Sequence, residues 1–319
     1  MSYEQLLLLG LKVGALAAFV LFVAKPIYDY HRDPNDLRRF PAVSRFAALT
    51  NLWYMYNTWS HQRYIKLHAA HKKNPILRIG PNHLSFGEAD AIRDVLGHGV
   101  FLRKSEFYAV LAGSHRHVVD VQDRAEHSRK RKVLATAYSA KAVSAYEPVV
   151  AGKIGTVIWK FDGFCSKPLK EGEIVPDSET FNYRLWSNML TFEVIARIGA
   201  SQDLGMLEQG TDLVDVENLD GKLYTTNAIE SLHESTKISV TFAWSTLWYK
   251  FNRWLTQLHP GWRHGQAWVD FNVRIARNRV KADKQGQRMS DFLGALLYDR
   301  DQKPREPEFG EILAETNSK

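Results

Sequence analysis

Residues 123–139 read DRAEHSRKRKVLATAYS, the most densely charged stretch of the chain, and their pattern predicts a helix over 123–135. Residues three or four positions apart share one face of a helix. On this helix they are Arg124, His127, Ser128 and Arg131. A guanidinium can hold a carboxylate through two hydrogen bonds and a nearby imidazole adds a donor, so this face suits an acidic ligand. A solvated basic surface is the alternative, because runs of charge are usually exposed.

Helical patterns continue on both sides of this stretch. We predict helices over 60–73, 88–96, 140–161, 178–198 and 261–284, another between Leu223 and Leu255, and a shorter one that Ser290 caps and that runs to Tyr298. Gly199 is expected to stop the helix that starts at 178. Two short β-type runs, 76–79 and 83–86, flank a Gly-Pro-Asn turn and predict a hairpin. The fold class is therefore mainly α with a small β-sheet.

The N-terminal stretch 6–24 reads LLLLGLKVGALAAFVLFVA and carries a single charge, Lys12. Such a segment is long enough to span a bilayer. A cleaved signal peptide is the alternative, but its apolar part should be shorter and should end in a small-x-small site. We therefore expect an N-terminal transmembrane helix as membrane anchor over 1–25, a stalk and proline-bearing hinge over 26–59, and a folded region over 60–319.

Charge and cysteine content narrow the setting. Four basic residues follow the apolar segment closely, Lys25, Arg32, Arg38 and Arg39, whereas one acidic residue, Glu4, precedes it. The positive-inside rule then places the folded region on the cytosolic side. The single cysteine, Cys165, excludes an intrachain disulfide and a cysteine-based metal cluster. A net charge of +7 permits anionic partners. Because no nucleic-acid-binding module is recognisable and the N-terminal segment can span a membrane, we expect membrane lipid and no nucleic acid as partners.

The stretch 123–139, with its His127-x-x-x-Arg131 spacing, resembles helix C of fungal microsomal cytochromes P-450, the haem-thiolate monooxygenases, and ascomycete enzymes of the benzoate para-hydroxylase type in particular. Other stretches resemble the same family in family order: 70–73 and 77–86 its first helix and hairpin, 181–207 its helix E region, and 309–315 the start of its central helix I. The resemblance implies a P-450 fold, incomplete in this chain. It also implies hydroxylation of a small aromatic or lipophilic molecule in fungal secondary or aromatic metabolism, with electrons from an NADPH-dependent reductase, at the endoplasmic reticulum membrane, in a single-pass protein with a cytosolic head.

The same resemblance assigns site residues. In the family the residues that match His127 and Arg131 bind the haem propionates, and Arg124, Arg129 and Lys130 are weaker candidates. These three residues could instead belong to a basic surface that docks the reductase. The segment 101–117 matches the family's substrate-recognition loop, where Phe107, Tyr108 and Leu111 could line a pocket, although packing alone would explain these residues nearly as well.

The chain also departs from the family. The F-x-x-G-x-R-x-C-x-G loop, whose cysteinate is the axial iron ligand, is absent, as is the A-G-x-D-T-T segment of helix I. Cys165 lies between two predicted helices in DGFCSKP and is interpreted as a structural thiol. We therefore expect the N-terminal portion of a monooxygenase, truncated before the oxygen-activation helix, with doubtful haem binding, no metal site, no catalytic residue and no activity alone.

Two further functions are open on the sequence. A metal site could be built from His61, His68 and His71, or from His115 and His117, but no H-E-x-x-H or other metal motif accompanies them. The serious alternative is a non-catalytic, membrane-anchored remnant or interaction protein, which could compete for the reductase without turning over a substrate.

Overall fold

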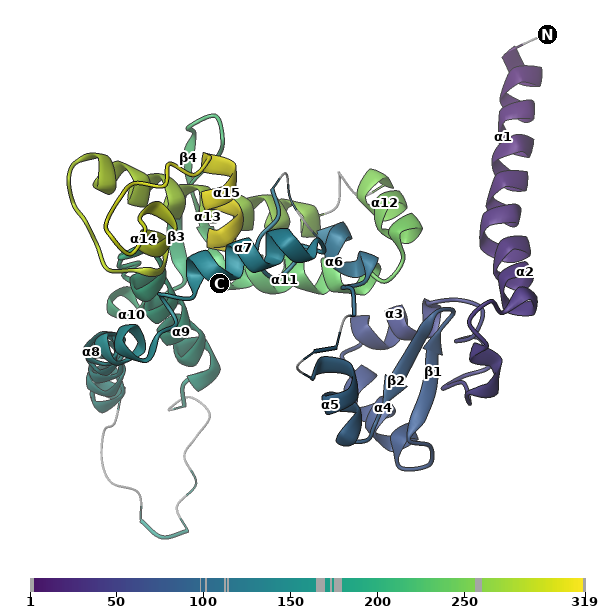
Figure 1. Ribbon diagram of the computed structural model, residues 1–319, viewed down its shortest axis with the longest axis horizontal. Coiled ribbons are helices and arrows are strands. Elements are labelled where there is room, and N and C mark those ends of the chain that lie inside the picture. The colour runs from purple at the N-terminus through teal and green to yellow at the C-terminus, as the bar shows by residue number, and fades with distance from the viewer. Residues whose placement is uncertain are drawn as a thin grey trace. The chain divides into compact units, whose positions relative to one another are not determined.

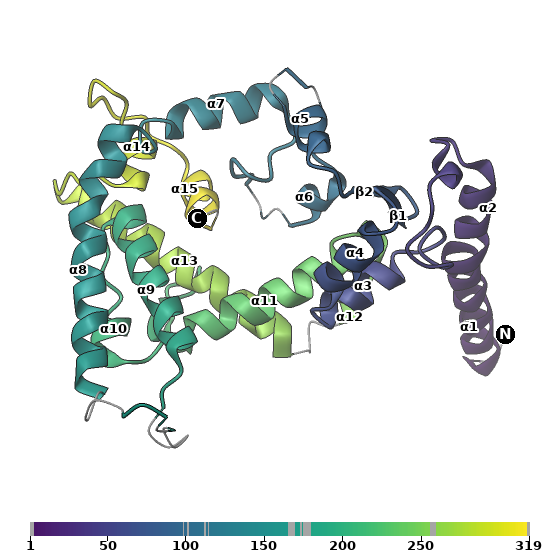
Figure 2. The same ribbon diagram turned by 90° about the horizontal axis from the view of Figure 1, so that it is seen from below.

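The computed structural model describes residues 3–317 except 98, 101, 112, 114, 165–169, 173, 175–179 and 256–259 (Figures 1 and 2). The described chain is mainly helical, which confirms the predicted fold class. It divides into two compact units. The first consists of Met1–Arg103 with Lys237–Asn252, and the second of Lys104–Thr236 with Arg253–Lys319.

The apolar N-terminal segment forms one long helix (Figure 1). Helix α1 (Tyr3–Phe19) continues through a π-helical turn (Val20–Ala24) into α2 (Lys25–Arg32), with Pro26 in the first turn of α2. Its most apolar window has a mean hydropathy of 2.5, and none of that window is buried within the protein. At 1.5 Å per residue a helix of this length exceeds the roughly 30 Å of a bilayer's apolar core. By length and composition it is therefore able to cross a membrane.

The rest of the first unit packs short helices against a hairpin. The helices are α3 (Leu52–Trp59), α4 (Arg63–His71) and α5 (Asp90–Leu96), preceded by a 3-10 turn, Leu37–Arg39. Strands β1 (Ile76–Gly80) and β2 (His83–Phe86) pair antiparallel with Ile76 opposite Phe86, which confirms the predicted hairpin. Tyr54, Leu77 and Ile79 form its small core, and Trp244 packs against them.

The second unit holds the larger core. Its helices are α6 (Glu106–Leu111), α7 (Arg124–Leu134), α8 (Ala140–Phe164), α9 (Tyr183–Ala200), α10 (Met206–Gln209), α13 (Pro260–Lys284), α14 (Phe292–Leu297) and α15 (Phe309–Asn317). Helices α8 and α9 lie side by side, and α13 packs against α9, α15 and strand β3 (Leu213–Glu217), as Figures 1 and 2 show. Fully buried apolar side chains at the centre include Met189, Leu207, Val216 and Leu293.

A second hairpin was not expected from the sequence. Strand β3 pairs antiparallel with β4 (Leu223–Asn227). The helix predicted between Leu223 and Leu255 is present, but it starts after this strand and a second helix follows it. The region holds a strand followed by α11 (Ala228–Phe242) and α12 (Thr246–Leu255). The backbone switches at Ala228 because Asp212 serves the new helix end: its carbonyl accepts from Ala228 N at 3.0 Å and its carboxylate from Ile229 N at 3.1 Å.

Two predicted helix boundaries are also wrong. Helix α9 runs through the buried Gly199 and ends at Ala200. The next residue, Ser201, has a φ of 55° and supplies the left-handed cap that Gly199 was expected to provide. It begins at Tyr183 rather than at 178, a position outside the described residues, because the Asn182 side chain accepts from the Arg184 backbone N–H at 3.1 Å.

The residue predicted to cap α14 is also wrong. Asp291, not Ser290, accepts from the backbone N–H of Gly294, at 2.6 Å. The same carboxylate receives Arg279 Nε at 2.7 Å, and both side chains are 1% exposed. The Asp291 carboxylate therefore has two roles: it caps the start of α14, and it neutralises the buried guanidinium of Arg279.

Candidate functional site

Helix α7 forms where the charged stretch predicts it. The Asp123 side chain caps the start of the helix by accepting from Glu126 N at 2.8 Å. At the other end of the helix, the side chain of Leu134 is buried. His127 and Arg131, four residues apart, line one cavity of about 540 Å³ in the second unit. The cavity is completed by Lys104, Tyr108, Val118, Val119, Leu134, Ala135 and Tyr138.

The cavity combines an apolar wall with basic and phenolic groups. Lys104 Nζ donates to the carbonyls of Val118 at 3.1 Å and Val119 at 2.7 Å, which holds the ammonium against that wall. Tyr138 packs edge-on against Phe292, with ring centroids 4.9 Å apart. The arrangement suits a ligand with an apolar body and an anionic edge.

Electrostatics favour an anion. Burial, together with the positive charges of Lys104 and Arg131, lowers the pKa of His127. Burial also lowers the pKa of Lys104, although the nearby Asp120 carboxylate opposes this shift. No carboxylate is among the described residues that line the cavity, so a bound carboxylate would relieve the mutual repulsion of the basic groups. The donor set thus fits the propionate edge of a haem.

Of the other candidates predicted from the sequence, some line this cavity and some do not. Tyr108 lines it, and Phe107 packs edge-on against Tyr108 with ring centroids 5.5 Å apart. Leu111 belongs to α6, but its side chain lies outside the described residues, as does Phe101. Arg124 is exposed on α7 and does not line the cavity.

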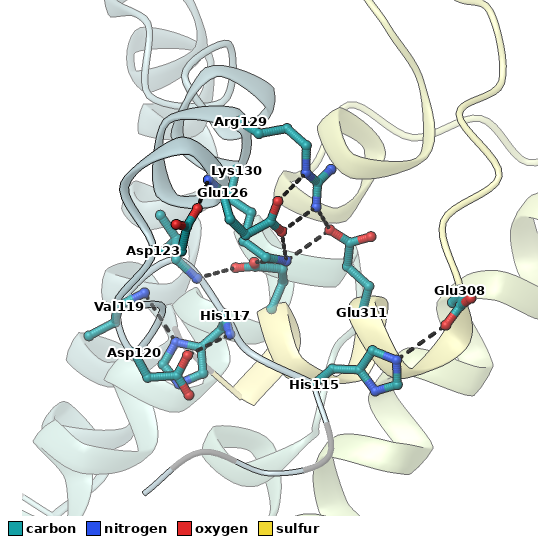
Figure 3. A network of polar contacts seen from close by, with 12 residues as sticks. His115, His117, Val119, Asp120, Asp123, Glu126, Arg129, Lys130, Glu308 and Glu311 are labelled. Atoms are coloured by element: carbon teal, nitrogen blue, oxygen red, sulfur yellow. Dashed lines mark hydrogen bonds and ion pairs between the residues drawn. The ribbon is translucent and has the colours of Figure 1, made fainter. Parts of the chain in front are cut away.

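Arg129 and Lys130 are engaged by acidic side chains rather than forming an open basic surface (Figure 3). Lys130 is 5% exposed, and its Nζ lies 2.8 Å from Glu311 Oε1 and 3.2 Å from Glu315 Oε1. Arg129 binds Glu126 through two hydrogen bonds of 2.8 Å and also reaches Glu311. These contacts join α7 to α15.

The acidic partners on α15 were not singled out in the sequence. Burial opposes the ionisation of Glu311, but hydrogen bonds from Lys130 and Arg129 outweigh it and lower its pKa. Glu315 is 1% exposed, and its Oε2 accepts from the backbone N–H of Val118 at 3.4 Å. The network therefore also reaches a wall residue of the cavity. The i, i+4 spacing of Glu311 and Glu315 is the signal that could have predicted a shared basic partner.

A pair formed by His117 and Asp120 lies beside this network. His117 Nε2 is 3.3 Å from Asp120 Oδ2, and His117 N donates to Asp120 Oδ1 at 2.8 Å. Burial lowers the pKa of His117 and raises that of Asp120, while each group opposes the shift of the other. The pair fixes the turn that leads into α7.

Two further histidines considered for a metal site have other partners. His115 contacts Glu308 at 3.2 Å, and His71 lies 2.8 Å from Ser85 Oγ and 3.1 Å from the Asn74 carbonyl. Within the described ranges no group of three or more His, Cys, Asp or Glu side chains could hold a metal ion. Cys165 lies outside those ranges.

Comparison with known proteins finds fungal monooxygenases among the relatives, although no family model matches the chain. The chain is 28% identical to "Benzoate 4-monooxygenase bphA" of Aspergillus niger over 309 residues, which cover 95% of this chain and 58% of that protein. It is 32% identical to "Cytochrome P450 monooxygenase hepC" of Aspergillus oryzae over 203 residues, 61% of this chain and 39% of the relative. "Cytochrome P450 monooxygenase ORF11" of Penicillium roqueforti is 27% identical over 241 residues, 73% of this chain and 47% of the relative.

The names of these relatives and the mainly helical fold agree with a partial cytochrome P450 fold. The chain is similar to the N-terminal portion of fungal cytochrome P450 monooxygenases. It spans 58% of the length of the benzoate 4-monooxygenase it matches. The resemblance first visible in residues 123–139 is confirmed.

Proposed function

We propose that this chain forms the propionate-binding and substrate-facing parts of a haem monooxygenase that hydroxylates a small aromatic or lipophilic molecule, in fungal secondary or aromatic metabolism. The observation that carries the proposal is that His127 and Arg131 line one cavity whose described wall holds no competing carboxylate. The similarity to a benzoate 4-monooxygenase of Aspergillus niger supports a small aromatic acid as one member of the substrate class.

Each lining residue has a distinct part in this proposal. Arg131 offers a planar pair of donors to one carboxylate, and His127 offers a single N–H to a carboxylate beside it. Tyr108, with Phe107 behind it, faces the same cavity and would contact the ligand's apolar body. When bound, a haem would supply the chemistry of oxygen activation, for which the family uses an axial cysteinate.

The family's cysteinate loop is absent from these 319 residues. We propose that turnover needs an axial thiolate from outside them and that the chain by itself is not an active monooxygenase. The proposed setting is the cytosolic face of the endoplasmic reticulum membrane, with α1 as a single-pass anchor and an NADPH-dependent reductase as partner. A non-catalytic, membrane-anchored interaction protein is the second candidate. The buried pairing of Lys130 with Glu315 removes one cation from the surface open to a reductase, whichever candidate holds.

The test is a titration of the purified chain, in detergent, with ferric haem and with haem dimethyl ester, followed by absorbance. His127→Ala and Arg131→Ala should each weaken haem binding at least tenfold, because each removes a charge-assisted hydrogen bond. Neither substitution should change binding of the ester, which has no carboxylate. Lys132→Ala, at an exposed position of the same helix that does not line the cavity, is the matched control.

Equal loss of haem and ester binding in both variants would mean that the substitutions damage the cavity rather than the carboxylate contacts. Unchanged haem binding would remove the assignment of His127 and Arg131. Haem binding that responds as expected, without the thiolate-type spectrum of the reduced carbon monoxide complex, would support both the propionate site and the need for an external axial ligand.

A further inference from the structure

A second cavity, of about 560 Å³, lies within the first unit, between the end of the apolar helix and the hairpin β1–β2. Leu21 and Phe22, from the last turns of the apolar segment, line it on one side. Arg78 of β1 lines it from the folded region, together with the turn residue Asn82. The cavity therefore joins the only described helix able to cross a membrane to a buried charge.

Arg78 is the unusual group in this cavity. It is 3% exposed, and its guanidinium donates from Nε to the Gly80 carbonyl at 3.4 Å and from Nη2 to the Pro81 carbonyl at 2.7 Å. Its Nη1 is buried and has no hydrogen-bond partner in the described part of the chain. A buried charged donor without an acceptor is costly, so an acceptor bound at this nitrogen would stabilise the site.

Asn51 presents the complementary group. Its Nδ2 donates to the Trp244 carbonyl at 2.9 Å, and because a carbonyl can only accept, this bond fixes the orientation of the amide. Its Oδ1 is then left buried with no donor among the described residues. Both groups adjoin Gly80: Arg78 bonds its carbonyl, and a Cβ at Gly80 would lie 2.6 Å from Asn51 Oδ1.

The charges around the cavity leave a basic surplus. Five charged residues line it, three basic and two acidic: Lys25, Asp29, Arg32, Asp33 and Arg78. Asp29 is paired with Lys25. Asp33 attracts Arg78 electrostatically, but its oxygens accept from Leu37 N and Arg38 N, both at 3.0 Å, and from Arg38 Nε at 3.3 Å. Neither carboxylate hydrogen-bonds Arg78 Nη1.

We propose that this cavity binds a phosphate ester that also carries a hydrogen-bond donor. A phosphate oxygen accepts from Arg78 Nη1, and the hydroxyl or ammonium group of the ester donates to Asn51 Oδ1. Guanidinium is well matched to phosphate, and the Tyr30 ring, 5.7 Å from the Arg78 guanidinium, covers its face. A phospholipid headgroup and a soluble phosphate ester share this chemistry. The lipid source rests on the proposed membrane anchoring by α1.

The experiment uses the full chain, purified in detergent and stripped of phospholipid. Four probes are compared by thermal shift and by native mass spectrometry: dihexanoyl phosphatidylethanolamine, dihexanoyl phosphatidylcholine, glycerophosphoethanolamine and inorganic phosphate. We expect the ethanolamine lipid to bind at least fivefold more tightly than the choline lipid, because choline has no N–H to offer Asn51. Tight binding of glycerophosphoethanolamine as well would assign the site to soluble esters, whereas binding of the intact lipid alone would assign it to a headgroup with its acyl chains.

Arg78→Gln should reduce binding of the ethanolamine lipid at least tenfold, with Arg39→Gln as the control, since Arg39 is an exposed cation of the same region that does not line the cavity. The headgroup comparison in the unaltered chain needs no variant, so it decides the matter even where Arg78→Gln fails to fold. Equal binding of both lipids, or no binding of any probe, would overturn the proposal. Flotation with plain phosphatidylcholine vesicles tests the anchor separately, and the haem titration tests the proposed function in the other unit.

Discussion

Lys130 Nζ lies 3.2 Å from Glu315 Oε1, and the two side chains are 5% and 1% exposed. This buried ion pair ties the charged helix α7 to the short helix α15 (Figure 3). Isolated helices as short as α15 are marginal in water, so its nine residues depend on such contacts. The stretch that carries the family resemblance thus also stabilises a segment far along the chain.

Lys130→Met should destabilise the second unit by about 3–5 kcal/mol, because it leaves the buried carboxylate of Glu315 without its cation. Chemical denaturation followed by far-ultraviolet circular dichroism measures the change. Lys132→Met, at an exposed position of the same helix, should change the free energy of unfolding by less than about 0.5 kcal/mol. Similar effects of the two substitutions would contradict the importance of the pair.

Asp291→Ala should cost about 3–5 kcal/mol, because it strips the buried Arg279 of its counter-ion and removes the α14 cap. Ser290→Ala should leave the midpoint of thermal unfolding within about 2 °C, since Ser290 does not cap the helix. Scanning calorimetry of both variants separates them. A larger effect at Ser290 than at Asp291 would reverse the assignment of the cap.

Glu193 is fully buried and accepts from Met206 N at 2.6 Å and Leu204 N at 3.3 Å while pairing with Lys153 Nζ at 2.9 Å. Glu193→Ala should therefore destabilise the second unit by about 3 kcal/mol or more, because both backbone donors lose their acceptor. The control is Glu208→Ala, whose carboxylate is half-exposed and 3.8 Å from Lys153, and which should cost less than about 1 kcal/mol. Urea unfolding would test the contrast, and equal midpoints would refute it.

Acid should weaken the fold before its carboxylates titrate. Burial lowers the pKa of His83 below its ordinary 6.5, so the unfolded chain binds this proton more readily than the folded chain. Stability from this group is then complete above about pH 6.5 and is lost as the pH falls from there toward the folded-state pKa. Thermal unfolding at pH 7.5 and 5.5 should show a smaller drop for His83→Gln than for the unaltered chain. An equal drop in both would exclude His83 as a source.

Local sequence patterns predicted the elements that depend on neighbours in the chain. The helix over 123–135 and the hairpin at 76–86 carry their own caps, turns and periodicity, and both are confirmed. The strand Leu223–Asn227 and the true cap at Asp291 could not be read in the same way, because each is fixed by a distant partner. Asp212 sets the start of α11, and Arg279 draws Asp291 inward.

In the candidate site, too, the features set by neighbouring residues could be predicted from the sequence, and those set by distant residues could not. The i, i+4 spacing predicted that His127 and Arg131 share one face of a helix, and in the structure both residues line one cavity. The burial of Lys130 was not visible, because its partners Glu311 and Glu315 lie about 180 positions away. A run of charge in a sequence does not say which of its members will meet carboxylates from another helix.

The outer edge of β1 has a practical consequence. Arg78 N donates to the Pro41 carbonyl at 2.8 Å, and the Arg78 carbonyl accepts from Val43 N at 3.0 Å. Residues 41–43 therefore occupy the hydrogen-bonding groups that a bare sheet edge would offer to a strand of another molecule. A version of the chain shortened to begin just before Pro41 keeps this edge covered, whereas one that begins after Val43 uncovers it and invites edge-to-edge association. The safe place to remove the apolar helix for work in aqueous buffer is thus set by two backbone hydrogen bonds, not by where the apolar residues end.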